Sequence, residues 1–154
     1  MSRRFRRIVV VGSFFHSMVS IAILAILTLS TPAAAASLLA RVDLSQQRME
    51  VYVNGHKRHV WAVSTGRDGW NTPPGKYYPF ALTRQYYSSQ WRMSLPYLIS
   101  ISRDGIAIHG TELSSKLGRR ASHGCIRLSI PNAARLYALV QKYGMASTEV
   151  VVVR

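Results

Sequence analysis

Apolar and polar residues alternate along two short segments that follow the N-terminal third of the chain. Residues 38–44 and 48–53 both show this period of two, which predicts half-buried β-strands. Asn54 and Gly55 come next and form a strong hairpin signal, because both residue types accept positive φ angles. We therefore expect residues 56–65 to return as the partner strand.

More strands are predicted in the middle of the chain. The segment Thr72-Pro-Pro-Gly75 predicts a turn, since proline lacks the N–H group that a strand ladder needs. Residues 76–85 and 95–102 are expected to form strands. The Asp-Gly pair at 104–105 then turns the chain into a short strand at 106–109.

The last third of the chain predicts a loop at 112–121, a strand at 124–128, a helix and a final strand. The loop is expected to be a hairpin-like connection. Apolar residues follow Pro131 at helical spacing and stop before Gly144: Ala134, Leu136, Leu139, Val140 and Tyr143. Residues 148–153 are largely apolar, which predicts a strand in the middle of a sheet.

The N-terminus is typical of a targeting segment. Four arginines precede a mostly apolar stretch at 8–29, and small residues at 31–37 offer a cleavage site. We expect a signal peptide or an N-terminal membrane anchor over residues 1–36, followed by a single mainly β domain over residues 37–154. Positive charge before the apolar stretch predicts export of that domain.

The chain is strongly basic, with 20 Lys and Arg against six Asp and Glu residues and a formal charge of +14. Without the four N-terminal arginines, 16 basic residues remain against six acidic ones, or about +10. This charge predicts an anionic wall or membrane surface as a neighbour, although a plain solvated surface explains it equally. No nucleic-acid-binding motif accompanies the charge, so nucleic acid is not expected as a partner.

Cys125, the only cysteine, carries the candidate chemistry. It stands in Ser122-His-Gly-Cys-Ile-Arg127, downstream of His109-Gly-Thr111. A thiol attacks as its thiolate and needs a proton acceptor, which His109 can supply. Two other interpretations are open: both residues are structural, or they bind zinc together with His123, although their spacing matches no common zinc finger.

These motifs resemble the L,D-transpeptidase catalytic domain family, also called the YkuD domain, whose signature is an upstream His-Gly followed by Ser-His-Gly-Cys. The resemblance extends through residues 41–55, 63–66 and 72–75 to the final strand. It implies a mainly β sandwich or barrel of the YkuD type with one helix in its C-terminal half. It implies neither a cofactor nor a metal.

The resemblance also implies a role for each residue of the two motifs. Cys125 would be the nucleophile, His109 the proton donor and acceptor, and the Gly110 main-chain carbonyl the group that orients the histidine. The backbone N–H groups of His123, Gly124 and Cys125 would bind the oxyanion.

Three further assignments in the second motif complete the site. Ser122 and His123 would shape the pocket. Arg127 would face the substrate or buttress the site, because a guanidinium can hold a carboxylate by two contacts. A purely structural ion pair of Arg127 is an equally open interpretation.

For the substrate, the resemblance implies a peptidoglycan stem tetrapeptide in the cell envelope, in the periplasm or at the outer face of the cytoplasmic membrane. Cys125 would displace the terminal D-alanine and carry the acyl group as a thioester. Transfer to an amine would give a 3→3 crosslink or tether an envelope protein. The alternatives are an L,D-carboxypeptidase, with water as the acceptor, and a noncatalytic wall-binding module.

Several residues outside the motifs allow a structural and a functional interpretation. For the aromatic residues before Met93 we favour core packing over a substrate-covering flap: Trp70, Tyr86, Tyr87 and Trp91. Arg119 and Arg120 either steer an anionic polymer or belong to a solvated loop. His56 and His59, beside the hairpin, are expected to be solvated.

Overall fold

A hairpin that turns at Asn54 and Gly55 joins the second and third strands of the fold. A computed structural model describes residues 36–154. Strand β2 (Arg48–Val53) pairs antiparallel with β3 (His56–Ala62) across the turn. The two turn residues have φ angles of 48° and 77°, which a two-residue hairpin of this kind requires. The predicted hairpin is confirmed, although β3 ends before the predicted residue 65.

The first sheet has five strands in the order β3, β2, β1, β11, β4. The remaining three are β1 (Leu38–Asp43), β11 (Thr148–Val153) and β4 (Gly75–Tyr77). Strand β11 runs parallel to β1 on one side and antiparallel to β4 on the other. The prediction that the final strand lies inside a sheet is therefore confirmed.

The second sheet has four strands in the order β10, β9, β8, β5. Their bounds are Ile126–Ser129, Ala107–Thr111, Leu98–Ser100 and Ala81–Thr83. Strands β9 and β10 run parallel, so the expected hairpin-like connection between them is wrong. Parallel neighbours need a crossover that carries the chain back along the sheet, and the loop with the short 3₁₀ turn η1 (Ser114–Lys116) does this.

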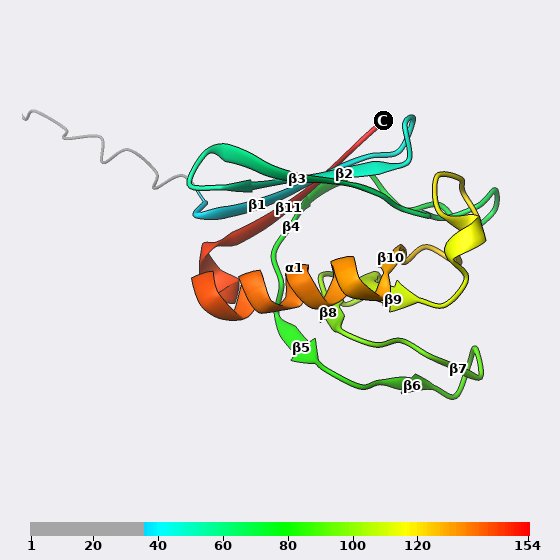
Figure 1. Ribbon diagram of the computed structural model, residues 1–154. Coiled ribbons are helices and arrows are strands. Elements are labelled where there is room, and N and C mark those ends of the chain that lie inside the picture. The colour runs from blue at the N-terminus through cyan, green and yellow to red at the C-terminus, as the bar shows by residue number, and fades with distance from the viewer. Residues whose placement is uncertain (1–35) are drawn as a thin grey trace, which may run out of the picture. The chain divides into compact units, whose positions relative to one another are not determined.

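The predicted strand at 76–85 divides into two strands that belong to different sheets. Strand β4 ends at Tyr77 and β5 begins at Ala81. Pro79 lies between them and has no N–H to donate to a ladder. The chain therefore crosses from the first sheet to the second here, as the green segment of Figure 1 shows.

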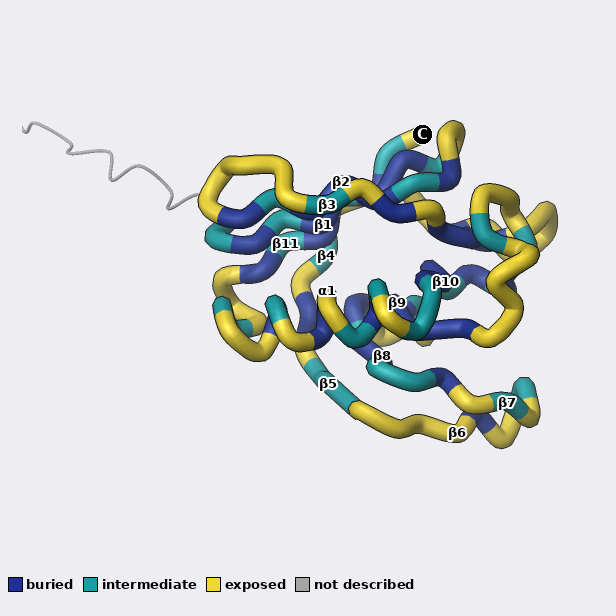
Figure 2. The backbone as a smooth tube through the Cα atoms, viewed as in Figure 1, coloured by how far each residue is buried: buried dark blue, intermediate teal, exposed yellow. Residues whose placement is uncertain are grey.

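The predicted strand at 95–102 is likewise shorter than expected. Only its residues Leu98–Ser100, which form β8, pair with the neighbouring strands β5 and β9. Just before it, β6 (Tyr87–Ser88) and β7 (Met93–Ser94) form a separate two-stranded hairpin. Figure 2 shows exposed chain from β5 to β6, whereas buried residues gather between the two larger sheets. The β6–β7 hairpin is thus an appendage of the core.

The predicted helix is confirmed as α1 (Ile130–Tyr143), which follows β10 directly. The Ser129 side chain accepts a hydrogen bond from the Asn132 N–H at its N-terminus, and a proline stands in the first turn. Gly144, with a φ of 85°, ends the helix. A short 3₁₀ turn, η2 (Met145–Ser147), then leads into β11.

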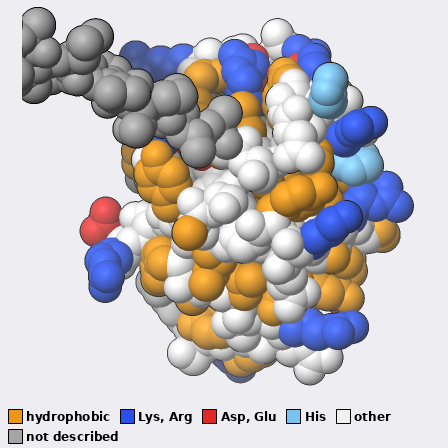
Figure 3. All heavy atoms as spheres, turned by 90° about the vertical axis from the view of Figure 1, so that its left-hand side faces the viewer, with side chains coloured by type: hydrophobic (Ala, Val, Ile, Leu, Met, Phe, Trp, Pro, Cys, Tyr) orange, Lys and Arg blue, Asp and Glu red, His pale blue; other side chains and the backbone are white. Residues whose placement is uncertain are grey.

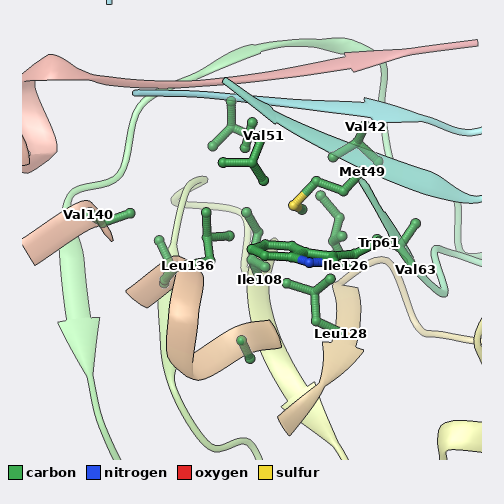
Figure 4. Packing of buried hydrophobic residues seen from close by; sticks show 14 of the residues in the cluster. Val42, Met49, Val51, Trp61, Val63, Ile108, Ile126, Leu128, Leu136 and Val140 are labelled. Carbon is green, nitrogen blue, oxygen red and sulfur yellow. The ribbon is translucent and has the colours of Figure 1, made fainter. Parts of the chain in front are cut away.

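The hydrophobic core lies between the first sheet on one side and α1 with β8 to β10 on the other (Figure 1). Figure 4 shows Val51 and Met49 of the first sheet and Ile108 and Leu128 of the second pointing into one space, with Trp61 among them. Together these residues form one contiguous cluster. The mainly β architecture of residues 36–154, with one α-helix among them, agrees with the expected fold class.

The targeting segment expected over residues 1–36 lies, up to residue 35, outside the described residues. Within residues 36–154, no helix combines the length and the apolar character that a membrane crossing needs.

We predict that Leu136→Ala lowers the free energy of unfolding by about 2–5 kcal/mol. Leu136 lies on the core side of α1 with 1% of its surface exposed, so its truncation leaves a cavity against the sheets. Urea denaturation measures the change. The control is Gln141→Ala on the exposed side of the same helix, for which we expect a change within about 0.5 kcal/mol. Equal effects of the two substitutions would contradict this packing.

Candidate active site

The loop that carries Cys125 is attached to the chain that leaves β3. Ser64 and Arg127 exchange both main-chain hydrogen bonds, at 3.0 and 2.9 Å. The Thr65 carbonyl accepts from the N–H groups of Ala121 and Ser122, both at 2.9 Å. The segment that follows β3 therefore holds both ends of this loop in place.

Two glycines allow this loop and its neighbour to approach closely. A Cβ atom on Gly66 would lie 1.8 Å from the Trp70 carbonyl oxygen, which no side chain can do without moving the backbone. Gly124 has a φ of 107°, and a Cβ atom there would lie 3.0 Å from Ile106. The glycine of the second motif is thus required by its dihedral angle, whereas the close contact with the end of the Ile106 side chain adds a smaller constraint.

Hydroxyl groups hold the loop in this shape. The Ser122 Oγ donates to the Cys125 carbonyl at 2.6 Å and accepts from the Gly124 N–H at 3.1 Å. The Thr72 Oγ1 donates to the Gly124 carbonyl at 2.6 Å and accepts from the Gly66 N–H at 2.9 Å. Both hydroxyl groups are used as donor and as acceptor.

This arrangement corrects the predicted oxyanion donors. The Gly124 N–H is occupied by Ser122, so it does not point freely toward a substrate. Within residues 36–154, the N–H groups of His123 and Cys125 have no internal acceptor. Ser122 itself is fully buried; it shapes the loop instead of lining a pocket.

His109 lies in β9 and is paired in register with Arg127 of β10. Its Nδ1 is 2.8 Å from the Gly110 carbonyl oxygen. Because a carbonyl can only accept, Nδ1 carries the proton and Nε2 is left as the basic nitrogen. Burial lowers the pKa of His109 to about 4, against a smaller opposing effect of the Gly110 hydrogen bond, while Arg127 lowers it further. The ring is therefore neutral at pH 7.

Cys125 lies immediately before β10, and its thiol packs into a small apolar cluster of Met93, Leu95, Leu98 and Ala107. The Sγ donates to the Gly105 carbonyl at 3.6 Å. Burial raises the pKa of the thiol, while the Ala107 N–H and Arg127 oppose that rise. Among the hydrogen bonds of residues 36–154, none joins the thiol to His109. The thiol is thus protonated at rest and must turn toward the imidazole to react.

Arg127 is buried and has no acidic partner among residues 36–154. Its Nη1 donates to the Ala121 carbonyl at 3.3 Å, while its Nε is buried without a partner. The structural ion pair is therefore wrong for the described part of the chain. The positive charge of Arg127 instead acts on its neighbours. It adds to the lowering of the pKa of His109 and His123, and it opposes the rise that burial causes in the pKa of Cys125.

The favoured core packing of the aromatic residues before Met93 is also wrong. Trp70 is 44% exposed and Tyr87 is 64% exposed. Trp91, in the β6–β7 hairpin, stacks on the His123 ring with centroids 4.0 Å apart, and Trp70 meets both rings edge-on. The hairpin thus reaches over the Cys125 loop, in agreement with the flap alternative.

The zinc interpretation has no ligand set within residues 36–154, where no group of three or more His, Cys, Asp or Glu side chains could hold a metal ion. His59 is half-buried and stacks on Trp61, with ring centroids 4.9 Å apart. It is thus not the solvated histidine that we expected, whereas His56 is exposed.

Basic side chains near the site are partly structural. The Arg120 Nε donates to the Gly66 carbonyl at 2.8 Å, and its Nη2 donates to the Asn71 side chain at 2.7 Å. Arg120 thus braces the segment that supports the Cys125 loop. On the face in Figure 3, Lys and Arg side chains are spread out instead of gathered into one patch.

The family model described as YkuD, L,D-transpeptidase catalytic domain, matches residues 38–152. The chain belongs to this family. The matched residues include both motifs, α1 and the strands of the described part of the chain, up to the penultimate residue of β11. No match was found among curated proteins.

Solved L,D-transpeptidases have the same fold. The L,D-transpeptidase from Mycobacterium smegmatis is 21% identical with a TM-score of 0.70, over 77% of this chain and 59% of that one. One from Mycobacterium tuberculosis H37Rv is 26% identical with a TM-score of 0.67, over 77% and 58%. The LD transpeptidase LdtMt1 in complex with imipenem is 22% identical with a TM-score of 0.69, over 76% and 59%. This chain therefore spans less than two thirds of each.

Sequence reasoning missed Thr72 and Trp91 as neighbours of the catalytic loop. Thr72 was only part of a predicted turn, and Trp91 was assigned to the core. The one available signal was that residues 72–75 share in the resemblance to the L,D-transpeptidase family.

We predict that alkylation of Cys125 by iodoacetamide accelerates with pH up to a midpoint above that of a cysteine in a short peptide. A raised pKa leaves less thiolate at neutral pH, and Cys125 is the only cysteine, so intact mass reports its modification. The peptide measured in parallel is the control. A rate that is already constant at neutral pH would indicate a preformed thiolate–imidazolium pair and contradict the prediction.

Proposed function

We propose that this chain is an exported cysteine acyltransferase that acts on peptidoglycan stem tetrapeptides. One observation carries the proposal: Cys125 stands directly before the strand that pairs with the strand of His109, whose tautomer is set by Gly110, and the N–H groups of His123 and Cys125 have no internal acceptor within residues 36–154. Such amides stabilise the oxyanion of a tetrahedral intermediate. A neutral imidazole beside a protonated thiol is the pair that general-base catalysis needs.

The first half-reaction forms the acyl-enzyme. Cys125 Sγ attacks the carbonyl carbon before the terminal D-alanine, and its proton passes to Nε2 of His109. The N–H groups of His123 and Cys125 bind the developing oxyanion. When the C–N bond breaks, the imidazolium returns its proton to the leaving amine, so D-alanine departs and Cys125 holds a thioester.

The second half-reaction transfers the acyl group to an amine. His109 is neutral again and takes a proton from the attacking amine, and the C–S bond then breaks while the imidazolium gives this proton to the leaving sulfur, which regenerates the thiol. The amine of a neighbouring stem peptide gives a 3→3 crosslink, and an amine of an envelope protein gives a tethered protein. The low pKa of His109 supports this cycle, because an imidazolium with a low pKa readily gives its proton to the leaving group and the neutral base is thereby restored.

Export belongs to the same proposal. The arginines and the apolar stretch within residues 1–36 support a signal peptide or membrane anchor that delivers the domain to the periplasm or the outer face of the cytoplasmic membrane. A charge of about +10 on residues 37–154 supports long-range attraction to an anionic wall or membrane surface.

We predict that Cys125→Ala and His109→Ala each abolish the release of D-alanine from a disaccharide tetrapeptide. The first lacks the nucleophile and the second the base. Mass spectrometry of the products is the measurement, and crosslinked dimers that have lost D-alanine are expected from the wild type only.

The matched control is His59→Ala, which removes a histidine that stacks on Trp61 in β3, and it should retain activity. Circular dichroism checks that all variants are folded. Tripeptide monomers without crosslinks from the wild type would favour the carboxypeptidase alternative. Near-wild-type rates in either motif variant would contradict the assigned roles.

We predict that kcat/KM for the tetrapeptide falls with decreasing pH near pH 4, instead of near the ordinary histidine value of 6.5. His109 must be neutral to accept the thiol proton, and burial keeps it neutral down to about 4. Circular dichroism at each pH separates loss of activity from unfolding. An acid limb centred on 6.5 would contradict the buried, neutral imidazole.

A further inference from the structure

Thr72 lies outside both motifs, yet it contacts the catalytic loop directly. Its hydroxyl donates to the Gly124 carbonyl at 2.6 Å, across 52 positions of the sequence. The side chain is buried, with 2% of its surface exposed. Solvent therefore cannot replace this hydrogen bond easily, and the contact is a fixed part of the loop.

The hydroxyl of Thr72 is itself held in one orientation. It has a single proton, which goes to the Gly124 carbonyl, and one of its lone pairs accepts the Gly66 N–H at 2.9 Å. Gly66 packs against the main chain of Trp70 with no room for a side chain. The donor is thus anchored to the segment that supports the loop.

The consequence of this contact follows from the planarity of the peptide bond. The Gly124 carbonyl and the Cys125 N–H belong to one peptide unit, which is planar and trans. Within such a unit the C=O and N–H bonds point in opposite directions. A hydrogen bond that holds the Gly124 oxygen on one side therefore aims the Cys125 N–H toward the other side.

Glycine makes this restraint necessary. Gly124, with a φ of 107°, has wide conformational freedom, because it lacks a Cβ atom. Ser122 holds the unit that joins His123 to Gly124, through the Gly124 N–H, and the unit that joins Cys125 to Ile126, through the Cys125 carbonyl. Only Thr72 holds the unit between them, among the contacts of residues 36–154.

We propose that Thr72 is a positioning residue for acyl transfer, which aims the Cys125 N–H at the oxyanion of the tetrahedral intermediate. The inference rests on the proposed function only in that Cys125 attacks a carbonyl group. It does not depend on which acyl donor or acceptor the protein uses.

The test compares two reactions of the same thiol. Acylation by p-nitrophenyl acetate forms a C–S bond and releases p-nitrophenolate through a tetrahedral oxyanion. Alkylation by iodoacetamide forms a C–S bond and releases iodide by direct displacement, without an oxyanion. Both reactions consume the thiolate, so the ratio of their rate constants isolates the stabilisation of the oxyanion.

Thr72→Val keeps the shape of the side chain and removes the hydroxyl. We expect it to lower the acylation rate constant about 10- to 100-fold, since loss of an aligned oxyanion donor costs at least this much. Alkylation should change less than about twofold, because it needs no such donor. Thr72→Ser restores the hydroxyl and should keep both rates within about threefold of wild type.

Thr148→Val is the matched control. Thr148 is equally buried, with 1% of its surface exposed, and its hydroxyl also donates to a glycine carbonyl, that of Gly144, at 2.8 Å. Thr148 follows the C-terminal end of α1, whereas the Cys125 loop lies before β10, which leads into the N-terminal end of α1. This variant should lose stability and keep the ratio of the two rates.

Thr72→Ala is measured as well, in case the valine does not fold, and melting curves accompany every variant. If both hydroxyl-free variants lose acylation and alkylation to the same extent, the loop has lost its structure as a whole and the proposal is overturned. If neither rate constant changes, so that their ratio keeps its wild-type value, the proposal is overturned too. A wild type that reacts with the ester but releases no D-alanine from the tetrapeptide would refute the proposed function and leave the test of Thr72 intact.

Discussion

The parallel pairing of β9 with β10 is the constraint on which the site depends. It places Arg127 opposite His109 and therefore brings Cys125, just before β10, to the neighbouring level of Ala107. A shift of one residue would turn every side chain of one strand to the opposite face. The register is secured from both sides, since Ile108 and Ile126 are buried in the core and Ser64 pairs with Arg127 at the outer edge.

The shape of the Cys125 loop is set by hydrogen bonds between side-chain hydroxyl groups and the main chain, and not by charges. The peptide units around Gly124 are held by the hydroxyl groups of Ser122 and Thr72, and Gly66, which donates to Thr72, packs closely against the main chain of Trp70. In this loop, and among the described residues, the amides of His123 and Cys125 are left without internal acceptors. Preorganised amides of this kind stabilise developing charge without rearranging during the reaction.

Burial determines the protonation of the resting site. It raises the pKa of the Cys125 thiol and lowers that of His109, so both groups are neutral near pH 7. Arg127 adds a buried positive charge with no acidic partner among the described residues, and this charge favours the thiolate over the thiol. An anion formed at Cys125 or on its substrate is therefore stabilised at the moment when it appears.

The sequence by itself determined the local elements and the candidate chemistry: the alternating strands, the Asn54–Gly55 turn, α1, and the pairing of Cys125 with His109 through two motifs of one family. Each of these is encoded by neighbouring residues. The tertiary structure alone decided that β9 and β10 run parallel, that Trp91 covers His123, and that Thr72 holds Gly124. These contacts join residues far apart in the chain, and hydrophobic periodicity and turn chemistry carry no information about which distant partners meet.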